Sequence, residues 1–311
     1  MIKIGFFGNS NLSAFCLNGL MEDYDVSFIV TGEDKRAGRG RKNQSIPVKQ
    51  IAEEKNIPLF QPINLHESNI LEAIKKIQVD IFVIVAYGKI IPEKVFTIPP
   101  LNAINLHPSL LPKYRGAAPV QWALINGEKT TGITVQLINK KLDAGDIILQ
   151  QKIDIEMDMT AGDLYHIILP TSVNLLKESI KILSSGKNTL TKQNEADATY
   201  CNKINRETAQ IKWNKSSISI HNLVRGLNPY PSSWTIFRKK NLKILKTIPF
   251  NEELDIHLKP GYLKKFQKKK LLVGSGNGNL EILQIQPEAK KIMDATPFIN
   301  GYRIIDDDHF D

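Results

Sequence analysis

Residues 2–31 constrain the fold of this chain more than any other stretch. An apolar run over residues 2–7 is followed by apolar side chains at helical spacing over residues 12–21 and by a second apolar run over residues 26–31. The two runs predict buried strands, and the segment between them predicts a helix. A strand, a helix and a second strand in this order indicate parallel strands joined by a right-handed crossover. We therefore expect an α/β fold with a Rossmann-like, mostly parallel sheet flanked by helices.

The turn after the first predicted strand argues against a dinucleotide-binding enzyme. It contains one glycine, Gly8, before the helix, whereas the dinucleotide fingerprint needs three spaced glycines. The same patterns predict further strands and helices in the first 184 residues. The expected strands are 57–60, 80–86, 103–106, 132–137 and 147–155, and the expected helices are 47–54, 70–76 and 163–183.

The C-terminal third has a different pattern, in which short strand-like runs are separated by turn residues. After an expected helix over residues 217–226, these runs cover residues 233–237, 242–247, 261–266, 270–274 and 280–286. Several short strands with glycine turns predict a small all-β barrel or sandwich. Residues 185–205 are polar and lack periodicity, which is typical of a linker. The expected organisation is therefore a domain over 1–184, a linker over 185–205 and an all-β domain over 206–311.

The positive charge of the chain is concentrated in this last third. The net charge over 311 residues is +9; residues 1–200 carry 22 basic and 21 acidic side chains, whereas residues 201–311 carry 19 and 11. The local excess of +8 predicts a polyanionic partner, with a merely soluble basic surface as the alternative. Two distant cysteines fit a reducing cytoplasm and argue against disulfides or a metal site. No apolar run approaches the length of a membrane span, so we expect no membrane contact. We also expect a cytoplasmic protein that acts as a monomer.

The segment Asn105–Pro112 carries the first chemical motif. Asn105 and His107 are two positions apart at the end of an expected strand, so their side chains lie on one face. An amide donor beside an imidazole can stabilise an oxyanion and move a proton. A solvated polar strand end is the alternative.

Asp143 offers a third group for the same site. It opens the turn Asp143–Asp146 between two expected strands, where a carboxylate can reach a neighbouring strand end of a parallel sheet. Near His107, it would orient the ring and stabilise the imidazolium, whereas a turn cap is the alternative, which we favour for Asp146. The chain has no serine or cysteine elbow, so we expect direct attack of an amine on a carbonyl carbon.

A basic loop follows the second expected strand. Lys35, Arg36, Arg39, Arg41 and Lys42 provide five cations within eight residues, interleaved with glycine. Such a segment can track phosphates through its charge and its backbone donors, and a solvated loop without function is the alternative.

Taken with Arg115–Gln121, Gly132–Val135 and Asp143–Asp146, the segment Asn105–Pro112 resembles the signature of the 10-formyltetrahydrofolate-dependent formyltransferases. This resemblance implies formyl transfer from 10-formyltetrahydrofolate, with Asn105, His107 and Asp143 as the catalytic set. It places Ser109, Leu110, Leu111 and Pro112 beside the folate, and we add Tyr87 and Gly88, which follow the expected strand 80–86.

Within the family, the chain resembles most the members that formylate initiator methionyl-tRNA. The basic loop, Arg115–Pro119 and the stretch Asn228–Trp234 carry this resemblance, which implies an OB-like tRNA-binding domain at the C-terminus. The tRNA contacts expected from the resemblance are Lys35, Arg36, Arg39, Arg41, Lys42, Arg115, Lys239, Lys240 and Lys243. A transferase acting on a nucleotide-sugar amine and a catalytically silent RNA-binding relative are the alternatives.

Overall fold

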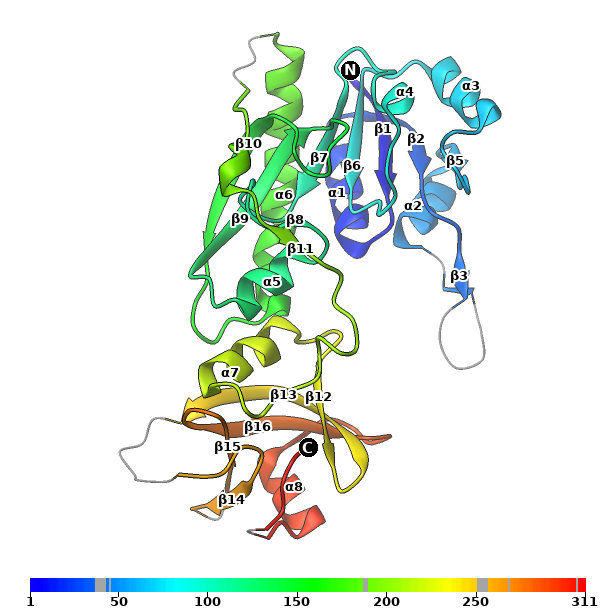
Figure 1. The fold of residues 1–311 in the computed structure, drawn as a ribbon. Helices are drawn as coiled ribbons and strands as arrows, with labels where there is room; N and C mark the ends of the chain where they lie inside the picture. The colour runs from blue at the N-terminus through cyan, green and yellow to red at the C-terminus, as the bar shows by residue number, and fades with distance from the viewer. Residues whose placement is uncertain (37–42, 45, 187–189, 251–256, 268, 306) are drawn as a thin grey trace. The chain divides into compact units, whose positions relative to one another are not determined.

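A computed structural model describes residues 1–36, 43–44, 46–186, 190–250, 257–267, 269–305 and 307–311 (Figure 1). The chain divides into two compact units, each made of three segments. Unit 1 consists of Met1–Gly116, Gly132–Ile153 and His166–Tyr200, and unit 2 of Ala117–Thr131, Asp154–Tyr165 and Cys201–Asp311. Among the described residues, no helix combines the length and apolarity that crossing a membrane requires.

Unit 1 is built on a seven-stranded sheet with the order β10-β9-β7-β6-β1-β2-β5. The pairs β1–β2, β1–β6, β2–β5 and β6–β7 are parallel, which confirms the expected α/β fold. The sheet is mostly rather than fully parallel, because β9 runs antiparallel to β7. The strands are β1 (Lys3–Gly8), β2 (Asp25–Val30), β5 (Leu59–Phe60), β6 (Ile81–Val85), β7 (Ala103–His107), β9 (Thr130–Leu137) and β10 (Ile147–Asp154).

The central strand β6 is buried along its whole length because both faces of the sheet are covered there. On one face, Phe7 packs against Phe28, Phe82 and Tyr87, with ring centroids 5.1–6.1 Å apart. The following helices and short strands also lie outside the sheet of unit 2. They are α1 (Asn11–Met21), β3 (Lys35–Arg36), β4 (Asn43–Gln44), α2 (Pro47–Lys55), α3 (Ser68–Ile77), α4 (Glu93–Phe96), β8 (Arg115–Gly116), α6 (Ala161–Ser184), η1 (Glu195–Asp197) and β11 (Tyr200–Cys201).

Unit 2 contains an antiparallel sheet with the order β12-β13-β16-β15-β14, and β17 pairs with β16. All five strands expected from the sequence are present. The helix α7 packs on β13 and β16, and α8 on β15 and β16. The elements are α5 (Pro119–Ile125), α7 (Ser217–Gly226), β12 (Ser233–Phe237), β13 (Lys240–Phe250), β14 (Leu263–Phe266), β15 (Lys270–Gly274), β16 (Asn279–Pro287), β17 (Met293–Asp294) and α8 (Ala295–Tyr302).

Residues 308–311 connect the two outer strands of this sheet. Ile236 of β12 exchanges two backbone hydrogen bonds with Asp311, and Leu263 of β14 donates to the carbonyl of Asp308. The hydrogen-bonded path therefore closes on itself, as in a barrel. Arg238 holds Asp308 through both carboxylate oxygens at 2.8 and 2.9 Å, so the acidic character of this segment has a structural use.

The segment 154–165 is fastened to α7 by buried polar groups. Arg225 donates to the carbonyls of Glu156 and Met159, both at 3.2 Å, and the Nε2 of His221 donates to the carbonyl of Met157 at 3.2 Å. Each of these bonds satisfies a polar group that is removed from water, so the segment and the helix depend on each other.

Candidate active site

Asn105 and His107 lie on β7, in the interior of the sheet of unit 1. The pairing of β7 with β9 puts Asn105 opposite Gln136 and His107 opposite Thr134. His107 is 5% exposed, so its imidazole works in a site from which bulk water is largely excluded. The two side chains share one face of the strand, as their spacing predicts.

The carboxylate of Asp143 accepts hydrogen bonds from three donors and faces the imidazole of His107. Its Oδ2 accepts from the backbone N–H of Gly116 at 2.8 Å and lies 3.6 Å from Nδ1 of His107. Its Oδ1 accepts from Nε2 of Gln136 at 3.3 Å and from Nδ2 of Asn105 at 3.5 Å. The structure therefore brings together the three side chains that the sequence predicts as the catalytic set.

The route by which Asp143 reaches His107 differs from our expectation. We expected adjacent ends of parallel strands, but β9 is antiparallel to β7. The loop after β9 instead folds back onto the sheet, where the N–H of Leu137 donates to the carbonyl of Asp146 at 2.9 Å. The backbone of the turn, rather than parallel strand order, positions the carboxylate.

Two backbone features of the turn are demanding. Asp143 has a φ of 49°, in the left-handed region, which costs a residue with a side chain roughly 1–2 kcal/mol. A Cβ on Gly145 would lie 1.7 Å from the carbonyl oxygen of Leu137, so only glycine fits there. The N–H of Gly145 also donates to Oε1 of Gln136 at 3.0 Å, which ties the turn to β9.

The hydrogen bonds of His107 define the roles of its two ring nitrogens. Nε2 lies 2.8 Å from the carbonyl oxygen of Tyr114, which can only accept, so Nε2 carries a hydrogen. Nδ1 faces the carboxylate of Asp143. A proton taken up by this imidazole therefore arrives at Nδ1, where Asp143 stabilises the resulting cation.

The loop Ser109–Pro112 is held in place from β9 and β10. The hydroxyl of Thr134 donates to the carbonyl of Ser109 at 2.7 Å and accepts from the N–H of Leu111 at 3.1 Å. Nε2 of Gln150 donates to the carbonyl of Leu111 at 2.8 Å. Ser109 and Leu111 are buried, whereas Leu110 and Pro112 remain partly exposed and offer an apolar surface.

The structure changes the interpretation of Tyr87 and Gly88. The side chain of Tyr87 is 2% exposed within the aromatic cluster around Phe7, and burial raises the pKa of its phenol to about 12. Its ring is therefore a core group and is not available to a donor substrate in this structure. Gly88 is exposed at a φ of 77°, so the backbone of this turn remains accessible.

Arg115 is likewise placed differently from our expectation of a tRNA contact. Its side chain is fully buried and pairs with Glu195 at 2.9 Å. The hydrogen bond that Arg115 donates to Glu195 is the main cause of its raised pKa. A guanidinium without exposed surface cannot meet a phosphate directly, so we assign Arg115 a structural role.

The remaining residues predicted to contact tRNA fall into two groups. Arg39, Arg41 and Lys42 lie outside the described residues, and Lys35 and Arg36 are described through the backbone of β3 alone. In unit 2, Lys239, Lys240 and Lys243 are exposed at and after the β12–β13 turn.

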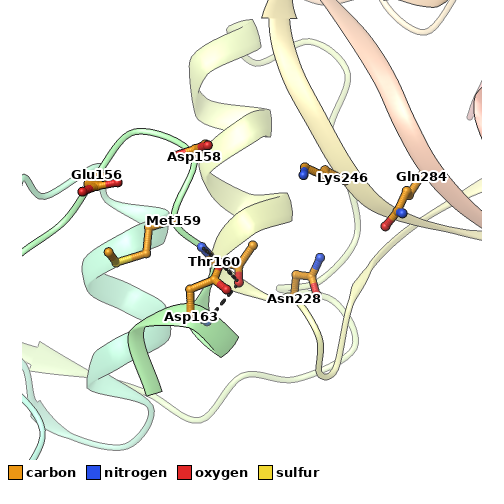
Figure 2. A pocket seen from close by; sticks show the side chains of 8 residues that line it. All are labelled: Glu156, Asp158, Met159, Thr160, Asp163, Asn228, Lys246 and Gln284. Carbon is orange, nitrogen blue, oxygen red and sulfur yellow. Dashed lines mark hydrogen bonds between the residues drawn. The ribbon is translucent and has the colours of Figure 1, made fainter. Parts of the chain in front are cut away.

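A pocket of about 470 Å³ lies in unit 2, and Figure 2 shows the eight side chains that line it. Thr160 and Asp163 bond each other there at the start of α6, with a hydroxyl-to-carboxylate distance of 2.6 Å. None of the predicted catalytic residues lines this pocket. Among the described residues, no group of three or more His, Cys, Asp or Glu side chains could hold a metal ion.

Comparison with known proteins identifies the class of protein that this fold and site define. Residues 3–180 match the formyl transferase family, and residues 203–303 match the formyl transferase C-terminal domain. The chain therefore belongs to the formyl transferase family.

Individual relatives narrow the comparison further. The chain is 40% identical to the methionyl-tRNA formyltransferase of Clostridium novyi (strain NT), over 97% of this chain and 98% of that protein. It is 39% identical to the methionyl-tRNA formyltransferase of Thermodesulfovibrio yellowstonii, over 96% of each. The N-formyltransferase from Helicobacter canadensis, solved with folinic acid and dTDP-3-aminofucose, shares the fold at 23% identity, with a TM-score of 0.68 over 92% of this chain and 100% of that chain.

Proposed function

We propose that this chain transfers the formyl group of 10-formyltetrahydrofolate to the amino group of methionyl-tRNA, for translation initiation. The convergence of Asn105 and His107 on Asp143 carries the proposal, in a chain that is 40% identical to a methionyl-tRNA formyltransferase. These contacts argue against a catalytically silent relative, because a binding protein has no need of a carboxylate that is held by three donors against an imidazole. We further propose that the protein works in the cytoplasm as a monomer.

The chemistry assigned to the three side chains conserves atoms and charge. The amine attacks the formyl carbon, and the oxygen of that carbon becomes negative. The side-chain amide of Asn105 donates one N–H to Asp143 and offers its second N–H to this oxyanion. His107 takes the proton of the amine at Nδ1, beside Asp143, and returns it to the folate nitrogen as the bond between that nitrogen and the formyl carbon breaks.

The donor side is assigned to the loop Ser109–Pro112, together with the backbone at Gly88. Thr134 and Gln150 fix the loop, and the partly exposed Leu110 and Pro112 provide an apolar wall for a flat heterocycle. Residues 1–184 then carry the chemistry, and the segment around Gln193, expected from the sequence to be a linker, belongs to unit 1 as well.

The acceptor side is assigned to the basic loop and to residues 206–311 with an OB-like barrel. On the barrel, Lys243 lies opposite Trp234 on the neighbouring strand, and the guanidinium of Arg206 lies 4.9 Å from the centre of the Trp234 ring. Cations interleaved with an aromatic ring suit a nucleic acid, whose phosphates and bases need both. Lys239 and Lys240 extend this surface.

The experiment that tests the proposal offers the protein two acceptors in parallel, methionyl-tRNA and a nucleotide-sugar amine, with 10-formyltetrahydrofolate as donor. We expect formyl-methionyl-tRNA as the product, and a kcat/KM that falls about tenfold or more between 50 and 200 mM salt, because phosphate contacts release counterions. Formylation of the sugar amine alone would contradict the proposal. Lys239→Ala with Lys240→Ala should raise KM for the tRNA, whereas the matched pair Lys75→Ala with Lys76→Ala, exposed on α3, should not.

A further inference from the structure

Gln193 lies in the polar stretch that the sequence predicts as a linker, yet its side chain is the centre of a partly buried hydrogen-bond network in unit 1. Its Nε2 donates toward three oxygens: the carbonyl of Asp143 at 2.9 Å, the carbonyl of Gly145 at 2.8 Å, and Oε1 of Gln136 at 3.0 Å. All three belong to the turn that holds the predicted catalytic carboxylate or to the amide that contacts it.

The amide oxygen of Gln193 faces donors instead. Oε1 of Gln193 accepts from Nε of Arg115 at 3.1 Å and from Nη2 of Arg115 at 2.8 Å. Acceptors on one side and donors on the other leave a single orientation for the amide. Arg115 is in turn fixed by Glu195, which takes two further hydrogens at 2.9 and 3.1 Å.

We propose that Gln193 is a positioning residue for catalysis, which holds Asp143 and Gln136 in register with His107. The backbone of Asp143 is in a left-handed conformation that is costly on its own, and the hydrogen bond to its carbonyl stabilises this conformation. Gln136 needs its Oε1 engaged by Gln193 and Gly145 so that its Nε2 points at the Asp143 carboxylate. Arg115 and Glu195 act behind Gln193 by fixing its amide.

This inference rests on the proposed function, because it treats Asp143 as catalytic. It predicts a specific behaviour for Gln193→Glu. A carboxylate has the shape of the amide but would set an oxygen against three acceptors and release the turn. Protonation of the new side chain restores one donor, so the defect should shrink as the pH is lowered.

The test compares Gln193→Glu and Gln193→Ala with the control Gln151→Glu, which makes the same charge change at an exposed position of β10. For the formylation of methionyl-tRNA, we expect both Gln193 variants to lower kcat by about 10- to 100-fold with KM values within about threefold. The activity of Gln193→Glu relative to the native protein should rise at acid pH, whereas that of Gln193→Ala should stay constant. Equal pH dependence of the two variants, or kcat within twofold of the control, would overturn the proposal.

A second readout needs no substrate. The ¹⁵N resonance of His107 Nδ1 reports the carboxylate beside it, and it should move in both Gln193 variants and remain unchanged in Gln151→Glu. An unmoved resonance in a folded Gln193 variant would overturn the positioning role, whatever the effect of the variant on activity. If the native protein fails to formylate methionyl-tRNA, the proposed function fails, while this spectrum still decides whether Gln193 holds Asp143.

Discussion

Replacement of Asp143 by asparagine tests the site most directly. The carboxylate accepts from Gly116 and faces His107 with one oxygen, and it accepts from Asn105 and Gln136 with the other. An amide has one oxygen, so its NH₂ group opposes either the N–H of Gly116 or the amides of Asn105 and Gln136. The best bond, from Gly116 at 2.8 Å, should keep the oxygen. The NH₂ group then repels the amides of Asn105 and Gln136, and His107 loses its counter-charge.

The expected effect follows from the bonds lost. A hydrogen bond to a charged group contributes roughly 1.5–3 kcal/mol, and two such interactions are lost or inverted. A total of about 3–6 kcal/mol corresponds to a fall in kcat of about 10²- to 10⁴-fold, at about 1.4 kcal/mol for each factor of ten. The assay is single-turnover formylation with both substrates saturating, and Asp146→Asn, which makes none of these four contacts, is the matched control. A folded Asp143→Asn protein with kcat within tenfold of the native value would refute the assignment of Asp143.

Two further predictions concern unit 2. Phe310→Ala should reduce the free energy of unfolding by about 3–5 kcal/mol, because the ring is 3% exposed and packs against Trp213 and Phe237. Urea titration measures this free energy of unfolding. The control Tyr230→Ala removes a ring that is 80% exposed and should change the free energy of unfolding by no more than about 0.5 kcal/mol. Equal effects of the two substitutions would disprove the closure of the sheet by residues 308–311. Burial lowers the pKa of the His221 imidazole in the folded protein. The neutral ring therefore stabilises the fold fully above the pKa of the unfolded state, about 6.5. This stabilisation is lost as the pH falls through the lowered pKa of the folded state. The melting temperature of the native protein should therefore fall between about pH 7 and 5.5, and His221→Asn should flatten this dependence; an unchanged slope would contradict the role of His221.

The fold was predictable where local pattern decides it. The apolar run of β6 and the alternation in β12 to β16 specify strands, and the expected helix over residues 217–226 coincides with α7. The direction of β9 was not predictable in this way. The residues of a strand indicate which faces are buried, but the path of the connection before it decides whether it runs parallel or antiparallel to β7.

The sequence predicted those residues of the candidate site that stand in short motifs with recognisable chemistry. Asn105, His107 and Asp143 carry groups whose chemistry is recognisable, and they stand in motifs. Gln193 stands in an aperiodic polar stretch, where nothing distinguishes it from a solvated side chain. Its three acceptors are 48 to 57 positions away in the sequence, so only the folded chain reveals them.

Arg115 illustrates the reverse error. An arginine in a glycine-containing loop reads as a phosphate ligand, because cations are seldom buried fully. In the structure, Arg115 can be buried because it donates to both carboxylate oxygens of Glu195 and to the amide oxygen of Gln193. Neither partner is recognisable from the residues around Arg115.

The interleaving of the two units limits how such a protein can be cut or recombined. The match to the C-terminal domain begins at residue 203, but unit 2 also contains residues 117–131 and 154–165. A fragment starting at residue 203 would keep the barrel and α7, yet Arg225 and His221 would lose the carbonyls that satisfy them. The segment from residue 203 onward is therefore not a self-sufficient block, and unit 2 is easier to alter through its surface side chains than by exchange of that segment.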